Sequence, residues 1–143
     1  MSDDLVTGWL AMLRLCNRLT QAIERELARE HRLCVSAYEL MSALAPAADW
    51  TRLGDLTERV SRSQPQVSRL VAQMEAAGVV QRTATPDDGR GSQVRLTEAG
   101  RELYAAATAT IGRILRDSAV PAVHFPPRAA TGRDDAEAAP AIG

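Results

Sequence analysis

Residues 63–80 read SQPQVSRLVAQMEAAGVV, and this stretch decides the fold. Ser63 can cap the free backbone N–H groups at the start of a helix, and Gln66, three residues later, can complete a capping box. Pro65 suits the first helical turn, where its missing N–H would be unpaired anyway. Apolar side chains then recur with the helical period, at Val67, Leu70, Val71 and Met74. The pattern predicts a helix that begins at Ser63 and turns one face toward a core.

The opposite face of this predicted helix is polar and carries no acid before Glu75. Its side chains are short or forked hydrogen-bonding groups, namely Gln64, Gln66, Ser68, Arg69 and Gln73. Such groups suit base edges and phosphates, and an arginine can form a bidentate contact to guanine. We expect Ser63 to serve first as a cap, and Gln66 to be partly occupied by the capping box.

The residues on either side of this helix complete a recognisable unit at about 51–100. Leu53, Leu56 and Val60 predict a short helix that ends before a turn at Ser61–Arg62, so two helices form a helix-turn-helix. Gly78 ends the second helix. Residues 79–82 and 93–96 are strand-like runs joined by a turn rich in Gly and Asp, which predicts a hairpin with Arg90 at its tip. The nearby basic residues Arg62, Arg82 and Arg95 are weaker candidates for phosphate contact.

Long helices are predicted at both ends of the unit. Residues 5–29 carry an apolar stripe at steps of three and four, which predicts a helix about 37 Å long. Because a small domain needs a shorter helix to cover its core, we expect part of the apolar stripe to contact another chain; the alternative is a helix packed wholly on its own domain.

Ser36 and Glu39 predict a capping box for a helix at 36–45. Thr97 caps a final helix at 98–117.

Composition and charge limit the number of domains, the location and the binding partners that we expect. The 143 residues suggest one domain over 1–117, followed by a Pro- and Ala-rich segment, 118–143, that we expect to be poorly ordered. No apolar run approaches the roughly 18 residues of a membrane span, and the N-terminus has acids where a secretory signal has positive charge, which favours the cytoplasm. The net charge is −1, yet residues 52–101 hold eight Arg against six acids. The positive charge therefore gathers on the helix-hairpin segment.

No pattern of residues predicts catalysis. The chain lacks a phosphate loop, metal-ligand spacing, a nucleophile elbow and a His-based triad, so we expect no enzyme, cofactor or metal site. Of the two cysteines, Cys16 belongs to the first apolar stripe, where burial would lower its reactivity. A cysteine-based redox sensor is therefore a minor alternative.

The segment 88–100, DGRGSQVRLTEAG, resembles the wing signature of the MarR family of bacterial transcription regulators, and 63–71 is similar to its recognition helix. The resemblance implies a mainly α fold with a small β-hairpin: a winged helix-turn-helix flanked by dimerisation helices at about 5–29 and 98–117. It implies a homodimer on a pseudo-palindromic operator in double-stranded DNA. It also implies that Arg90 enters the minor groove and that Asp88 holds the arginines of the wing in place. The residues implied to face the major groove are Ser63, Gln64, Pro65, Gln66, Ser68 and Arg69.

The expected function is that of a ligand-responsive repressor. The resemblance implies a small aromatic or lipophilic effector, with Trp9, Met12 and Tyr38 as candidates to line its crevice; core or interface packing is the alternative for these three. The final helix is shorter than is usual in the family. A second reading follows from this departure, in which the chain is a winged-helix interaction module that pairs with a relative and binds DNA weakly by itself.

Overall fold

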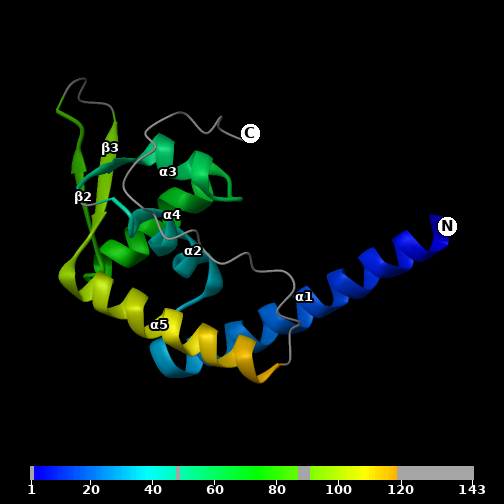
Figure 1. Cartoon of the computed structure of the whole chain (residues 1–143). Coiled ribbons are helices and arrows are strands. Elements are labelled where there is room, and N and C mark those ends of the chain that lie inside the picture. Colours follow the sequence, from blue (N-terminus) through cyan, green and yellow to red (C-terminus); the bar gives the residue numbers. More distant parts are fainter. Residues whose placement is uncertain (1, 48, 87–90, 119–143) are drawn as a thin grey trace, which may run out of the picture.

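The computed structural model describes residues 2–47, 49–86 and 91–118 (Figure 1). These residues form helices and a small antiparallel sheet, which confirms the predicted fold class. Along the chain the elements are α1 (Ser2–His31), α2 (Val35–Leu44), β1 (Thr51–Arg52), α3 (Leu53–Arg59), α4 (Gln64–Ala76), β2 (Val80–Ala84), β3 (Ser92–Leu96) and α5 (Glu98–Asp117).

One buried cluster joins all of the helices to the sheet. Each helix contributes the apolar residues that recur with its own period, and β3 contributes through Val94 at its centre. The largest fully buried side chains are Leu27, Leu40, Met41, Leu44, Leu56, Val67, Val71 and Val94. The winged unit and the end of α1 therefore share a single core.

The sheet has three strands in the order β1-β3-β2, where the sequence predicted only a hairpin. β1 pairs with β3 through Thr51↔Val94 and Arg52↔Gln93. A strand of two residues is too short to show the alternation by which strands are predicted, which explains why it was missed. β1 joins the start of α3 to the base of the wing.

Helix α1 extends beyond the predicted 5–29 at both ends. Its C-terminal part packs on α5 and α2, with Leu27 fully buried, whereas its N-terminal half projects away from the body (Figure 1). Large apolar side chains are left exposed there, at Leu5, Val6, Trp9, Leu10, Met12 and Leu13. The alternative prediction, that the whole apolar stripe packs on its own domain, is wrong.

Helix α2 does not begin with the predicted Ser36–Glu39 capping box. Its N-cap is Cys34, whose Sγ accepts a hydrogen bond from the Ala37 N–H at 3.4 Å. The Val35 N–H donates to the Glu24 carboxylate of α1 at 3.3 Å. Cys34 and a neighbouring helix thus satisfy donors at the start of α2, and Glu39 is free for another role.

Helix α5 begins as predicted, with Thr97 as N-cap. The Thr97 hydroxyl accepts from the Gly100 N–H at 3.0 Å and donates to the Gly78 carbonyl at 2.7 Å. Gly78 has φ +77°, which is the left-handed geometry expected of a glycine that ends a helix. One hydroxyl therefore ties the end of the helix-turn-helix to the start of α5.

Polar contacts hold α1 against α5 further along. Glu30 accepts hydrogen bonds from the buried Thr110 hydroxyl at 2.8 Å and from the Arg113 guanidinium at 2.7 Å. These two bonds lower the pKa of the Glu30 carboxyl. His31 Nε2 lies 2.9 Å from the Thr110 Oγ1. Because that hydroxyl gives its hydrogen to Glu30, Nε2 is the donor to it.

Candidate nucleic-acid interface

The start of α4 is built as predicted. The Ser63 Oγ accepts from the Gln66 N–H at 3.4 Å, while the Gln66 Oε1 accepts from the Ser63 N–H at 3.1 Å. Pro65 lies in the first turn. These bonds satisfy orphan donors at the helix end and fix its first turn. The Gln66 oxygen is therefore occupied, although its amide NH₂ is not used by the capping box.

The polar face of α4 is open to solvent. Gln64, Gln66, Arg69 and Gln73 are exposed and Ser68 is half-buried. On the opposite side, Val67, Val71 and Met74 are buried. Packing therefore holds the helix by one face and leaves the acid-free face available to a ligand.

The predicted contact residues divide into two groups, one along each side of α4. On one side, Gln64 and Ser68 line a hollow of about 390 Å³ together with Arg82 of β2 and Arg52. On the other side, a smaller hollow of about 190 Å³ is lined by Arg62, Gln66, Arg69 and Gln73 with part of α2. The helix thus has arginines beside it on both flanks, and arginine is a residue type that contacts phosphates.

The arginines of the two described wing strands, Arg82 of β2 and Arg95 of β3, lie on opposite faces of the hairpin. Arg82 pairs with Val94, so it shares the inner face with the core, and its guanidinium contacts Ser92 Oγ at 3.2 Å. Arg95 lies on the outer face, donates to Gln81 Oε1 at 2.8 Å and stacks 4.4 Å from the centroid of Trp50. Of these two arginines, only Arg82 lines the hollow of about 390 Å³ beside Gln64 and Ser68.

Arg62 occupies the turn before α4 and faces Glu39 of α2. Its Nε lies 3.6 Å from Glu39 Oε2 and is buried without a hydrogen-bond partner among the described residues. The other carboxylate oxygen of Glu39 accepts from the Ser61 N–H at 3.1 Å. Glu39 therefore positions the turn that leads into α4. Sequence reasoning missed this role because it assigned the glutamate to a local cap.

Asp88 and Arg90, which the sequence predicts at the wing tip, lie outside the described residues. At the end of the strands nearest the tip, the Thr85 N–H donates to the Gly91 carbonyl at 3.0 Å. Arg52, which lines the hollow beside α4, is a further residue that sequence reasoning did not single out. No signal marked it, because β1 itself was not predicted.

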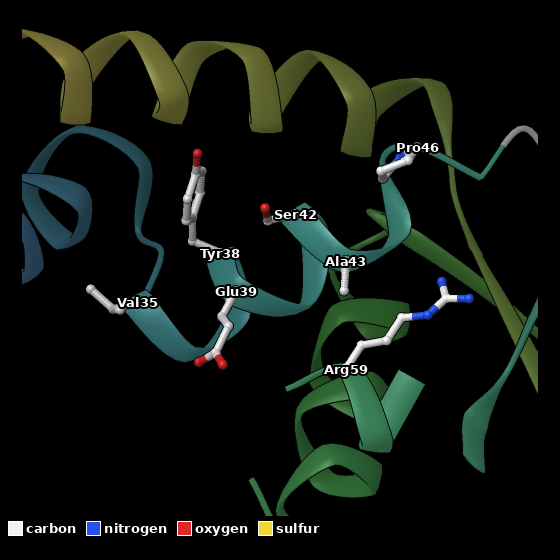
Figure 2. Close-up of a pocket in the computed structure, with 7 residues that line it drawn as sticks. All are labelled: Val35, Tyr38, Glu39, Ser42, Ala43, Pro46 and Arg59. Carbon is white, nitrogen blue, oxygen red and sulfur yellow. The ribbon is translucent and has the colours of Figure 1, made fainter. Parts of the chain in front are cut away.

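A separate cleft of about 590 Å³ lies beside α2 (Figure 2). It is lined by Tyr38, Glu39 and Ser42 of α2 and by Arg59 of α3, among others. Figure 2 shows Tyr38 and Ser42 pointing from α2 toward α5. The Tyr38 ring stacks on Tyr104 with centroids 5.3 Å apart, and burial raises the pKa of its hydroxyl. Within one chain, neither Trp9 nor Met12 lines this cleft.

The two cysteines and the potential metal ligands form no further site among the described residues. Cys16 is exposed, so its expected burial in the apolar stripe is wrong for a single chain, and Cys34 is the N-cap of α2. In the described part of the chain, no three His, Cys, Asp or Glu side chains come together as a metal site. Over the same residues, no helix combines the length and apolarity that crossing a membrane requires.

Comparisons with known proteins agree with this architecture. Residues 35–91 match the model of the MarR family. The uncharacterized HTH-type transcriptional regulator YdgJ of Bacillus subtilis is 32% identical over 82 residues, which cover 57% of this chain. The match spans about half, 49%, of the length of that relative.

Two solved structures from Streptomyces coelicolor have a similar fold. AbsC, a MarR family transcriptional regulator, is 26% identical with a TM-score of 0.72, and the match covers 82% of this chain and 79% of AbsC. Sco3205, solved in complex with DNA, is 22% identical with a TM-score of 0.75, and the match covers 89% of this chain and 78% of Sco3205. Together with the motif at 88–100 and the capped helix α4, these matches show a winged helix-turn-helix fold similar to that of the MarR family, whose model residues 35–91 match.

Proposed function

We propose that the chain is a homodimeric, DNA-binding transcriptional regulator, and specifically a repressor that a small aromatic or lipophilic effector releases from its operator. The observation that carries the proposal is the exposed, acid-free face of α4 with arginine on both flanks. The DNA complex of Sco3205 supports it through a shared fold.

In this proposal α4 lies in the major groove. Gln64, Ser68 and Arg69 reach base edges, and Arg62 and Arg82 contact phosphates on either side. Arg90 enters the adjacent minor groove, where an arginine is favoured by the negative potential. Gln73, one helical turn beyond Arg69, lies at the margin of the contact.

Selection of bound sequences from random DNA tests the proposal. We expect two half-sites about 10 base pairs apart, because a dimer places its two helices one helical turn apart. Arg69→Ala should reduce the preference for the selected sequence by roughly 1–3 kcal/mol, as for loss of one bidentate base contact. Arg90→Ala should weaken binding to any duplex and lower the salt slope by about 1. If the selection recovers no sequence, or if both variants bind like the wild type, the proposal is wrong.

Dimerisation is proposed to use the N-terminal half of α1. Its exposed residues include Leu5, Trp9 and Met12, with 77%, 56% and 55% of their surfaces open. Full burial of one such side chain is worth about 1.5–3 kcal/mol. A second copy supplies an equal apolar face through two-fold symmetry, so both faces are covered at once.

Light scattering on two charge variants tests the dimer. Trp9→Glu places a carboxylate in the apolar face and should yield monomers, whereas the matched control Arg14→Glu, off the stripe, should remain dimeric. A dimer that survives Trp9→Glu unchanged would place the interface elsewhere.

The cleft beside Tyr38 is the proposed effector site. An effector acts if it prefers the conformer in which the two α4 helices are wrongly spaced, because it then lowers the population that fits DNA. Trp9 and Met12 reach this cleft only from a second chain. Effector binding in this proposal therefore requires the dimer.

A second candidate function is an interaction module that pairs with a different MarR-like chain. The exposed face of α1 favours it, because that face accepts any complementary apolar helix. A chain that stays monomeric at concentrations on the order of tens of micromolar would support this second function, and a stable homodimer would argue against it.

A further inference from the structure

The side-chain amide of Gln66 is held in one orientation by the capping box of α4. Its Oε1 accepts from the Ser63 N–H at 3.1 Å, and the Gln66 N–H donates to the Ser63 Oγ at 3.4 Å. Because a backbone N–H can only donate, the atom of the amide that faces it is the oxygen and not the nitrogen. The capping box therefore decides which end of this amide remains for a ligand.

The end that remains is the NH₂ group, which only donates. Gln66 is exposed, and within the described part of the chain its NH₂ group makes no hydrogen bond. The side chain lines the hollow of about 190 Å³ together with Arg62 and Arg69, and no carboxylate lines that hollow. A ligand on this flank of α4 thus meets donors from all three side chains.

Gln64 differs from Gln66, although both lie in the first turn of α4. Gln64 takes no part in the capping box and lines the hollow on the other flank of the helix. Its amide can turn either way and offer a donor and an acceptor together, as bidentate recognition of adenine requires. The oxygen of Gln66 is directed at the Ser63 backbone, so its oxygen and its NH₂ group cannot both face one base edge.

The bases differ in the major groove by the same property that the capping box fixes in Gln66. Guanine O6 and thymine O4 are acceptors, whereas cytosine and adenine present an amino group at N4 and N6. A side chain that offers only a donor can bond to either keto oxygen. Opposite an amino group it leaves two donors facing each other, and both lose their hydrogen bonds.

We propose that Gln66 is a specificity-determining residue that donates from its NH₂ group to a keto oxygen, O6 of guanine or O4 of thymine. Side chains three residues apart on a helix, such as those of Gln66 and Arg69, are neighbours at about 5–6 Å. The keto base therefore lies next to the base that Arg69 reads. The inference rests on the proposed function, because it names a base that the same face of α4 reads.

Gln66→Glu tests the proposal, because glutamate keeps the capping oxygen and replaces the NH₂ group by a second oxygen. Glutamate also completes capping boxes and is favoured near a helix N-terminus, so the urea midpoint should not fall below that of the wild type. A lower midpoint would overturn the inferred orientation of the amide.

Selection of bound sequences from random DNA compares the two proteins. At the base next to the one that Arg69→Ala relaxes, the wild type should select guanine or thymine. Gln66→Glu should select adenine or cytosine there, because their amino groups donate to the carboxylate. Gln64→Glu is the matched control: it adds the same charge on the other flank, and should weaken binding while leaving the preference at this base unchanged.

Exchange of one keto group for an amino group in the selected operator measures the contact itself. Guanine→adenine keeps N7 and thymine→5-methylcytosine keeps the methyl group, with the complementary base changed to match. In a gel shift the exchange should weaken binding of the wild type roughly three- to tenfold, as for loss of one hydrogen bond, and strengthen binding of Gln66→Glu. The wild type alone decides the contact if Gln66→Glu binds too weakly.

Two results would overturn the proposal and leave the proposed function in place. One is the same base preference in the wild type and Gln66→Glu at every operator position. The other is a wild type that selects adenine or cytosine at this base, or that tolerates the exchange without loss of affinity. A wild type that selects no sequence would instead overturn the proposed function, and this proposal with it.

Discussion

Replacement of Gly100 by alanine probes the junction between the wing and α5. A Cβ built at Gly100 overlaps the Val79 carbonyl oxygen and lies 3.0 Å from the Val79 carbonyl carbon and 3.3 Å from Leu96 Cδ2. The Val79 oxygen also accepts the Thr97 N–H at 3.1 Å, so it cannot move away without weakening that bond. Overpacking typically costs about 1–3 kcal/mol and a weakened hydrogen bond about 1 kcal/mol. Alanine recovers about 1 kcal/mol of helix propensity, which leaves a net destabilisation of about 1–3 kcal/mol.

Gly112→Ala, on the same helix, is the matched control. Its Cβ would meet only the flexible end of Arg116, at 3.2 Å, so we expect it to stabilise α5 by about 0.5–1 kcal/mol. Urea unfolding of the two variants at one protein concentration measures the difference, and Gly100→Ala should also lower the Tm by roughly 4–12 °C. If Gly100→Ala proves as stable as Gly112→Ala, the inferred close approach of α5 to Val79 is wrong.

Further predictions concern the helix caps and the charged groups. Ser63→Ala should destabilise the fold by about 1 kcal/mol, measured by urea unfolding, because the capping box is lost; unchanged stability would contradict the cap. The folded-state pKa of Glu30 is lowered, so its contribution to stability is present above its unfolded value of about 4.3 and is lost as the pH falls through the folded value. Urea midpoints should therefore fall on acidification below about pH 5 in the wild type, and less steeply in Glu30→Gln. Glu39→Gln should weaken operator binding without a comparable loss of Tm, because the carboxylate orients the turn before α4; equal losses of both would indicate a purely structural role. Arg82→Ala should lower the salt slope of DNA binding by about 1, whereas Arg95→Ala, on the other face of the hairpin, should not; equal slopes would refute the assignment of faces.

The parts of the fold that were predicted correctly are those whose signals are local. The capping box of α4, the glycine after it and the Thr97 cap each depend on residues within one or two helical turns, so the sequence alone defines them. The start of α2 was mispredicted because a thiol and a carboxylate from α1 satisfy its donors, and neither lies in a sequence pattern that predicts a cap.

The residues of the candidate site could be predicted from the sequence, but their arrangement in space could be predicted only in part. Periodicity placed Gln64, Ser68 and Arg69 on one face of a helix. It did not separate Arg82 from Arg95, because their placement on opposite faces of the hairpin depends on the pairing register with β3. The burial expected of Cys16 failed for a related reason: a stripe shows which side of a helix is apolar, and not what covers it.

The Thr97 hydroxyl, bonded to both Gly78 and Gly100, has a mechanical consequence. These two bonds join the winged helix-turn-helix unit directly to α5 without a flexible linker, so the unit and the helix move together as one rigid body. With 20 residues, α5 is about 30 Å long, and a tilt of about 5° at its far end displaces the wing by roughly 2–3 Å. A displacement of that size is comparable to the length of a hydrogen bond. In the proposed dimer, small changes where two such helices cross would therefore be sufficient to break the register between protein and base pairs.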